Sequence, residues 1–177
     1  SHITNDLAIG LRIPVDIAEN VKLEYGAALP SEIGKRDVID LSHIGGVEEG
    51  SISRRESCEI IEGRLSEIFD LVNKELKKIG KEAFLPGGVV LVGGGAKTPH
   101  IVDLAKRKMR LPAQIGFPRE VEGIVERVDD PAYAASLGLV FWGMEERESI
   151  PEGFMPSIPS LNNSVREMRK WFKAFLP

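Results

Sequence analysis

Three consecutive glycines are the residues of this chain whose type and spacing best suggest chemistry. Gly93, Gly94 and Gly95 are followed by Ala96, and they come directly after the uncharged run of residues 87–92. Glycine allows positive φ and lets a ligand approach the main chain, and a helix that follows offers unpaired N–H groups. This pattern favours a nucleotide site, and a tight turn that packs a helix against a sheet is the alternative interpretation.

The two common nucleotide-binding motifs do not fit these glycines. Gly93 and Gly95 begin a G-x-G-x-x-G pattern, but Thr98 occupies the third glycine position and no acidic residue closes a following strand at the expected place. The sequence also contains no G-x-x-x-x-G-K-[ST]. A dinucleotide site is therefore disfavoured, and a P-loop is excluded.

The elements that must position the glycines form a strand–turn–helix–strand unit. The apolar run of residues 87–92 predicts a strand buried on both faces. Thr98 suits the N-cap of the following helix and Pro99 its first position. Residues 113–117 then predict a second strand, which a helical crossover makes parallel to the first. The predicted fold class is therefore α/β.

Helical periodicity also marks the segments before and after this unit. Thr4, Asn5 and Asp6 are predicted to cap a short helix, and a second helix is predicted from Pro14 to a C-terminal Gly26. Residues 27–51 predict one or two short strands, and residues 53–56 match a capping box that opens a helix extending to residue 80. Residues 129–131 are predicted to open a last core helix. Glu19 and Lys22 share one face of the second helix, where charged residues are usually solvated.

Composition narrows the class of protein. The 177 residues carry a net charge of −4, which gives no reason to expect nucleic acid as a partner. The single cysteine, Cys58, rules out a disulfide scaffold, and no cluster of metal-ligating residues is present in the sequence. The apolar run of residues 134–144 is too short to span a bilayer.

The C-terminal part of the sequence differs from the rest. Residues 145–163 are rich in proline, serine and charge without periodicity, which predicts a linker. Beyond it, cationic residues alternate at helical spacing with the apolar side chains Val165, Met168, Trp171, Phe172, Phe175 and Leu176. A short cationic amphipathic helix with aromatic residues is typical of a segment that lies in a membrane interface, and Arg169 is on its cationic face. Folding back onto the domain or docking on a partner are the alternatives.

Taken together, these segments resemble the FtsA family of bacterial cell-division proteins, within the actin-like ATPase superfamily. The similarity is carried by residues 3–8, 18–26, 87–96 with Pro99, 131–139 and the terminal helix, in this order. The resemblance implies a fragment of an actin-like (ribonuclease H-like) ATPase domain. Residues 1–14 and 87–144 would form an incomplete inner α/β subdomain, residues 15–86 an inserted outer subdomain, residues 145–163 a linker and residues 164–177 a membrane-targeting helix.

The resemblance also implies a nucleotide site. Gly93, Gly94, Gly95 and Ala96 correspond to the family's adenosine motif, and Glu19 and Lys22 to the helix that borders adenine and ribose. The expected cofactor is ATP, with Mg²⁺ in the full-length protein. The family's phosphate-gripping hairpins would precede Ser1, so the sheet is expected to be incomplete, and neither a catalytic residue nor hydrolysis by this chain alone is expected.

The partners implied by the resemblance are those of a membrane tether. They are the C-terminal peptide of the tubulin-like protein FtsZ, docking around residues 54–72, further copies of the protein in filaments, and the inner face of the cytoplasmic membrane at the division site. The alternatives are other actin-like proteins, namely a sugar-kinase or exopolyphosphatase type of enzyme and a pilus-assembly adaptor.

Overall fold

The computed structural model describes residues 1–44, 50–118 and 130–149. The chain divides into two compact units, Ser1–Leu137 and Gly138–Pro177, and each is described by itself. The terminal helix predicted at residues 164–177 and most of the predicted linker lie outside the described residues. The division into inner and outer subdomains stays a prediction.

The first two helices are α1 (His2–Leu11) and α2 (Val15–Tyr25), separated by Arg12, whose φ of 55° ends α1. The predicted cap at residues 4–6 is wrong, because α1 already begins at His2 and Thr4 lies inside it. Thr4 is 3% exposed, and its hydroxyl bonds to a side chain of α2 instead of to the start of its own helix.

Gly26 ends α2 as predicted, but for a different reason. Its φ of −67° is extended and not left-handed, so no turn of the αL type is formed. A Cβ at this position would lie 2.4 Å from the Lys22 carbonyl oxygen and 3.0 Å from Cδ1 of Ile61. Glycine is therefore required here mainly because a Cβ would clash with the Lys22 carbonyl oxygen of α2 itself, and it would also press on Ile61 of the next long helix.

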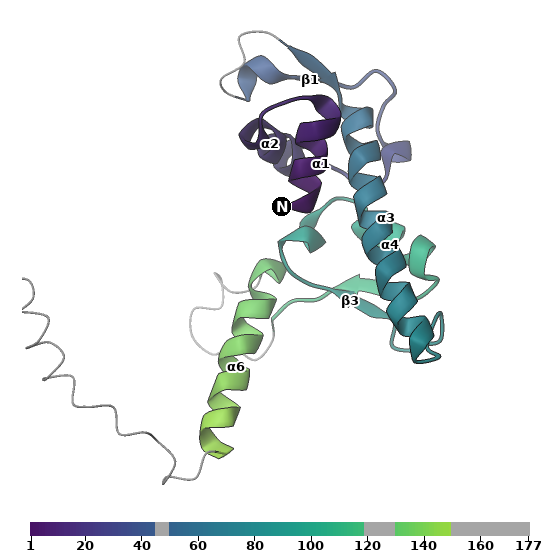
Figure 1. The fold of residues 1–177 in the computed structure, drawn as a ribbon, viewed down its shortest axis with the longest axis vertical. Helices are drawn as coiled ribbons and strands as arrows, with labels where there is room; N and C mark the ends of the chain where they lie inside the picture. Colours follow the sequence, from purple (N-terminus) through teal and green to yellow (C-terminus); the bar gives the residue numbers. More distant parts are fainter. Residues whose placement is uncertain (45–49, 119–129, 150–177) are drawn as a thin grey trace, which may run out of the picture. The chain divides into compact units, whose positions relative to one another are not determined.

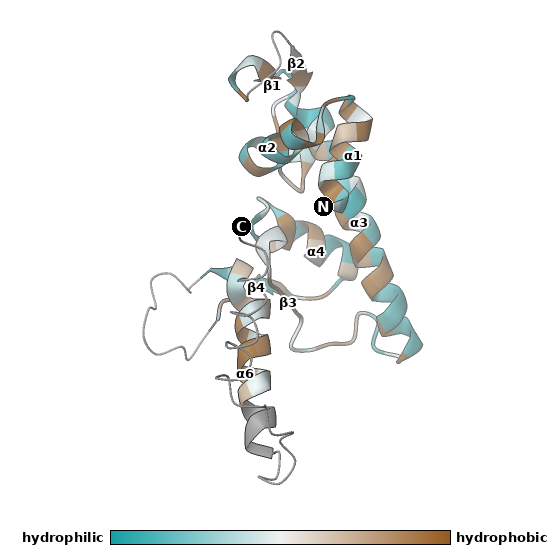
Figure 2. Ribbon diagram, turned by 60° about the vertical axis from the view of Figure 1, so that its left-hand side comes forward, coloured by the Kyte–Doolittle hydropathy of each residue, from teal (hydrophilic) through white to brown (hydrophobic). Residues whose placement is uncertain are grey.

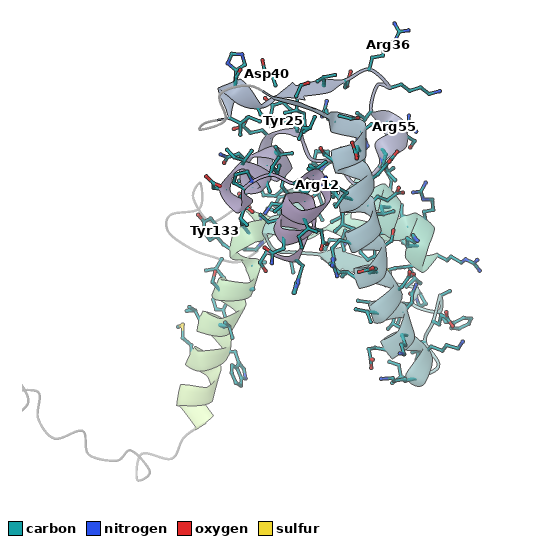
Figure 3. The ribbon with its side chains drawn as sticks, turned by 45° about the horizontal axis from the view of Figure 1, so that its top comes forward. Arg12, Tyr25, Arg36, Asp40, Arg55 and Tyr133 are labelled. Atoms are coloured by element: carbon teal, nitrogen blue, oxygen red, sulfur yellow. The ribbon has the colours of Figure 1, made fainter. Side chains whose placement is uncertain are left out.

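A small hairpin follows the two helices. After a 3₁₀ turn at Pro30–Glu32, strands β1 (Val38–Asp40) and β2 (Ser51–Ser53) pair antiparallel, with Ile39 opposite Ile52. Another 3₁₀ turn, Leu41–His43, is capped by the carboxylate of Asp40, which accepts from the Ser42 N–H at 2.9 Å (Figure 3). Residues 27–51 were predicted to form one or two short strands, and the described part of this region has two, of which the second begins at the last residue of that range.

The longest helix, α3 (Arg54–Lys78), begins at the predicted capping box. The Ser53 hydroxyl accepts from the Glu56 N–H at 3.3 Å. The helix is amphipathic, with Cys58, Ile61, Leu65 and Phe69 buried, and Figure 2 shows hydrophobic and hydrophilic positions alternating along it.

The glycine segment forms the predicted strand–turn–helix–strand unit. Strands β3 (Val89–Leu91) and β4 (Ala113–Ile115) pair in parallel, with Val90 opposite Gln114. A 3₁₀ turn at Gly94–Lys97 separates β3 from helix α4 (Ile101–Met109). The helix therefore starts later than predicted: Thr98 ends the 3₁₀ turn by donating its N–H to the Gly95 carbonyl at 3.1 Å, and His100, with φ of 63°, is the N-cap.

The prediction that β3 is buried on both faces is wrong. Val89 and Leu91 pack on the core, but Val90 is 52% exposed and Val92 is 51% exposed. The reason is that this sheet has two strands among the described residues, and α4 and α3 supply apolar cover on one side. The apolar composition of this segment predicted the strand correctly, but the further prediction that a second layer covers its other face was wrong.

One apolar core joins most of these elements. Leu7 of α1, Ala18 of α2, Ile61 of α3 and Leu104 of α4 are each fully buried in it. Figure 1 shows α1 and α2 beside the N-terminal half of α3, and α4 beside its other half. A second cluster, around Ile39, packs the hairpin on α2.

The last described element is helix α6 (Ala134–Ser149), preceded by a 3₁₀ turn at Pro131–Tyr133. Asp130 caps this turn through the Ala132 N–H at 2.8 Å, and Tyr133 stands where α6 begins (Figure 3). The helix starts close to the predicted position. Its packing on the sheet concerns both units and stays a prediction. None of the described helices is long and apolar enough to cross a membrane.

Candidate functional site

A pocket of about 740 Å³ lies beside the glycine turn, within the unit Ser1–Leu137. It is formed by the start of α1, by α2, by α3 and by the segments that follow β3. The lining residues are Ser1, His2, Ile3, Glu19, Lys22, Leu23, Ile68, Gly94, Gly95, Lys97, Thr98, Pro99 and Ala132. Four of the six residues predicted to bind a nucleotide are therefore brought together from two segments far apart in sequence.

Gly94 and Gly95 present bare main chain to this pocket. Both are exposed, and a Cβ built on either would meet no atom within 4 Å. Gly93 does not line the pocket; its φ of 88° turns the chain, and its N–H donates to the Pro131 carbonyl at 2.7 Å. Ala96 is 3% exposed and lies beneath the turn. The predicted motif therefore divides into two residues that line the pocket, Gly94 and Gly95, and two that do not, Gly93 and Ala96.

Glu19 and Lys22 form a network with a buried hydroxyl. The Lys22 ammonium donates to both Glu19 carboxylate oxygens at 2.6 Å and to the Thr4 hydroxyl at 3.1 Å. The Thr4 hydroxyl in turn donates to Glu19 Oε2 at 2.5 Å. The Lys22 side chain is 22% exposed and that of Glu19 42%. This pair is thus fixed at the pocket wall and is not a freely solvated surface pair.

The electrostatics of this network keep Glu19 ionised. The hydrogen bond from Lys22, and then the one from Thr4, lower the pKa of Glu19 below its ordinary value, against the opposing effect of burial. The Glu19 carboxylate is therefore an ionised acceptor at neutral pH, held in place by the hydrogen bonds from Lys22 and Thr4.

A second ion pair holds the glycine turn from the other side. Lys97 Nζ lies 2.7 Å from Asp130 Oδ2, and this hydrogen bond is the main reason that the pKa of Asp130 is lowered. Sequence reasoning missed Thr4, Lys97 and Asp130. Thr4 and Asp130 were interpreted only as capping residues, and the position of Lys97 immediately after the glycine motif was the signal that could have drawn attention to it.

The pocket has the character of a small-molecule site. Its volume is within the range of roughly 300–1,000 Å³ that such sites occupy. Bare main chain at Gly94 and Gly95 faces it, together with a carboxylate and an ammonium from α2, and these groups suit a ribose and a base. The residues present therefore fit an adenosine. No group of three or more metal-ligating side chains occurs among residues 1–44, 50–118 and 130–149.

The class of protein follows from this arrangement. A parallel strand pair joined by a helix, with a glycine turn opening onto a pocket at the end of the first strand, defines a mixed α/β protein, and in α/β proteins the ends of the strands are a common place for ligand sites.

Comparison with known proteins identifies the family. The family described as "Cell division protein FtsA" matches residues 1–138. Proteins of that name from Pseudomonas aeruginosa, Borreliella burgdorferi and Escherichia coli are 34%, 36% and 31% identical to this chain, over 82%, 84% and 81% of its length. The chain belongs to the FtsA family of cell division proteins, and this membership implies an actin-like fold.

The match covers only part of those relatives. The chain spans 35% of the length of the Pseudomonas protein and 36% of the other two. Family membership favours cell division over the sugar-kinase and pilus-assembly alternatives.

Proposed function

We propose that this chain is part of an actin-like, ATP-binding membrane tether that recruits and anchors FtsZ filaments at the division septum. The observation that supports the nucleotide part is the pocket, because its lining includes Gly94, Gly95, Glu19 and Lys22, four residues that the family resemblance assigns to one ligand. The glycines would contact ribose and α-phosphate, and the α2 pair would border the base and ribose.

The membrane part of the proposal is supported by the sequence. Residues 165–176 alternate apolar and cationic positions at helical spacing, and they follow a proline-rich stretch that suits a tether. One such helix binds lipid weakly and reversibly. Self-association into filaments would join many helices and so convert weak individual binding into stable attachment on the inner face of the membrane.

The partner part rests on family membership. A docking face for the C-terminal peptide of FtsZ is proposed around residues 54–72, which include the exposed apolar side chains Leu71 and Val72. We do not propose that this chain hydrolyses ATP by itself. Weak ATPase activity of the full-length protein is a separate question, which this proposal does not address.

Co-sedimentation with vesicles tests the tether. The chain should sediment with vesicles of phosphatidylglycerol and phosphatidylcholine, and deletion of residues 164–177 should abolish this. A Trp171→Glu variant should lose most of the binding, because it places a charge on the apolar face, whereas Ser164→Glu should change it little. Equal sedimentation of the full and shortened chains would show that residues 164–177 are not the membrane anchor.

Titration with a fluorescent ATP analogue tests the nucleotide pocket separately.

A further inference from the structure

The C-terminal ends of α3 and α4 meet at a second pocket, of about 690 Å³, which shares no lining residue with the glycine pocket. Its lining includes four cationic side chains, Lys74 and Lys77 from α3 and Lys108 and Arg110 from α4 and its C-cap. Two carboxylates, Asp70 and Glu82, also line it. Cations therefore outnumber carboxylates by four to two in a protein whose net charge is −4.

None of these four cations has an ion-pair partner among the residues that the structure describes. The neighbouring cations differ in this respect: Lys78 pairs with Glu75, Lys106 with Asp103, and Arg107 with Glu62. Helix dipoles favour cations at helix C-termini, which accounts for their presence there. The dipoles do not supply counter-charges for side chains gathered around one cavity, and an anionic ligand would.

Asn73 adds an unsatisfied acceptor to the same pocket. Its amide nitrogen donates to the Lys108 carbonyl oxygen at 3.1 Å, which fixes the orientation of the amide. Its Oδ1 atom is buried and has no hydrogen-bond partner in the part of the chain that the structure describes. Buried acceptors in folded proteins are nearly always satisfied by a protein group or by water, so this oxygen is open to a donor from solvent or from a ligand.

The chemistry of the occupant follows from this mixed lining. An anion can pair with the four cations, and Asn73 Oδ1, Asp70 and Glu82 can accept hydrogen bonds from donors on the same ligand. A phospholipid headgroup supplies the charge, and several headgroups also carry hydroxyl or ammonium donors, but a bilayer presents these groups in a plane that does not extend into a recess. A peptide with acidic side chains supplies both, because its main chain carries N–H groups.

We propose that this pocket binds an acidic segment of a partner protein, with carboxylates on Lys74, Lys77, Lys108 and Arg110 and a main-chain N–H on Asn73 Oδ1. The interaction is weak and salt-dependent, because the lysines of α3 are exposed. It does not depend on the nucleotide or lipid assignments made above.

Nuclear magnetic resonance titration of the full chain tests this proposal. The probe is a blocked peptide of alternating glycine and glutamate at low ionic strength, and the same peptide with glutamine is its control. The glutamate peptide should shift the Asn73 side-chain amide signals saturably, and the glutamine peptide should not. Added salt should weaken binding by about tenfold or more, as expected for several unscreened ion pairs.

Charge reversal provides the second arm. Lys74→Glu/Lys77→Glu should weaken peptide binding by about tenfold or more, since two attractive charges become repulsive. The matched variant, Lys35→Glu/Arg36→Glu, changes the net charge equally at exposed positions before β1 and should bind normally; Arg36 is labelled in Figure 3.

Three results would overturn the proposal. The first is the absence of a saturable shift at Asn73 with the wild-type chain, and the second is an equal loss of binding in both double variants. The third is displacement of the peptide by inorganic phosphate or phosphatidylglycerol vesicles at a concentration of negative charges below that of the peptide carboxylates. Because the first of these is measured on the wild-type chain, failure of a variant to fold cannot mask it.

Discussion

Thr4 illustrates how one hydroxyl can organise charged neighbours. It is buried in α1, donates to Glu19 and accepts from Lys22, and so it joins α1 to the pocket face of α2. An ion pair at the surface contributes little to the stability of the fold. When a buried third group already holds the two side chains in place, however, they lose less conformational entropy on binding a ligand. The network is therefore suited to presenting a preorganised carboxylate and ammonium.

Acid should weaken the fold through Asp6, which makes a two-pronged pair with Arg64 at 2.5 and 2.8 Å. The hydrogen bond from Arg64 lowers the pKa of Asp6 below its ordinary 3.8. A carboxyl group with a lowered folded-state pKa stabilises the protein fully above its unfolded value, and this contribution is lost as pH falls through the folded value. We expect Asp6→Asn to cost about 1 kcal/mol at neutral pH and to lose less further stability on acidification.

Urea unfolding at neutral pH and below pH 3.8 measures this effect. Asp16→Asn is the matched control, because Asp16 is an exposed residue of α2 without an ion-pair partner among the described residues. Equal pH dependence of the wild type and Asp6→Asn would contradict the assignment.

Two glycine substitutions separate ligand binding from folding. Gly95→Val adds a side chain where a Cβ meets open pocket space, so binding of a fluorescent ATP analogue should fall by at least about tenfold while stability changes by less than about 0.5 kcal/mol.

Gly88→Ala should instead lower the stability of the fold. Its φ is 70° and its Cβ would lie 2.3 Å from the Pro112 carbonyl oxygen, so stability should fall by about 2 kcal/mol or more. Nucleotide titration and thermal unfolding of both variants check the pair; unchanged binding by Gly95→Val would argue against the site.

At the scale of elements, α3 is the helix on which the other parts of the unit Ser1–Leu137 are assembled. It packs against α1, α2 and α4, and Arg64 and Glu62 on its surface pair with Asp6 of α1 and Arg107 of α4. Its N-terminus is joined to the end of α2, because Arg54 Nε donates to the Tyr25 carbonyl oxygen at 3.0 Å. Because α3 packs against three other helices, unwinding of its first turn would also weaken the contacts that these helices make with it.

The capping residue of α3 should therefore affect global stability. Ser53→Ala removes the acceptor for the Glu56 N–H and should lower the free energy of unfolding by about 1 kcal/mol. Ser53→Asp keeps an acceptor at the same place and should be close to the wild type. Equal destabilisation by the two substitutions would show that strand β2, in which Ser53 also lies, is the sensitive element.

At the scale of the whole unit Ser1–Leu137, the main apolar core makes unfolding cooperative. Leu7, Ile61 and Leu104 come from helices far apart in sequence and are fully buried in the same cluster. Because they share one apolar interior, the unit Ser1–Leu137 should unfold in a single transition, with the pocket lost at the same time.

A core truncation tests this. Leu104→Ala should cost about 2–5 kcal/mol, since it leaves a cavity among close-packed side chains. Leu71→Ala, at a position of α3 that is 63% exposed, should cost less than about 0.5 kcal/mol. Circular dichroism and ATP-analogue binding followed in the same urea titration should give coincident midpoints; separate midpoints would show that the core is not one cooperative unit.

The sequence by itself determined the features that depend on local spacing. The period of α3, its capping box, the parallel strand pair and the order of elements around the glycines follow from hydrophobic periodicity and cap residues, which act over a few neighbouring positions. The family resemblance, confirmed by comparison, also follows from local motifs in a fixed order.

Only the tertiary structure decided which residues meet. Thr4 acts within a helix and not as its cap. Gly26 forms no left-handed turn, and it leaves room for the Lys22 carbonyl oxygen and for Ile61. Strand β3 exposes Val90, because apolar composition does not specify how many layers cover a strand. The joining of Lys97 to Asp130, 33 residues apart, and the gathering of four lysine and arginine side chains around Asn73 are likewise invisible in sequence. Such contacts depend on long-range packing, because a side chain's partner is set by the approach of whole elements and not by its sequence neighbours.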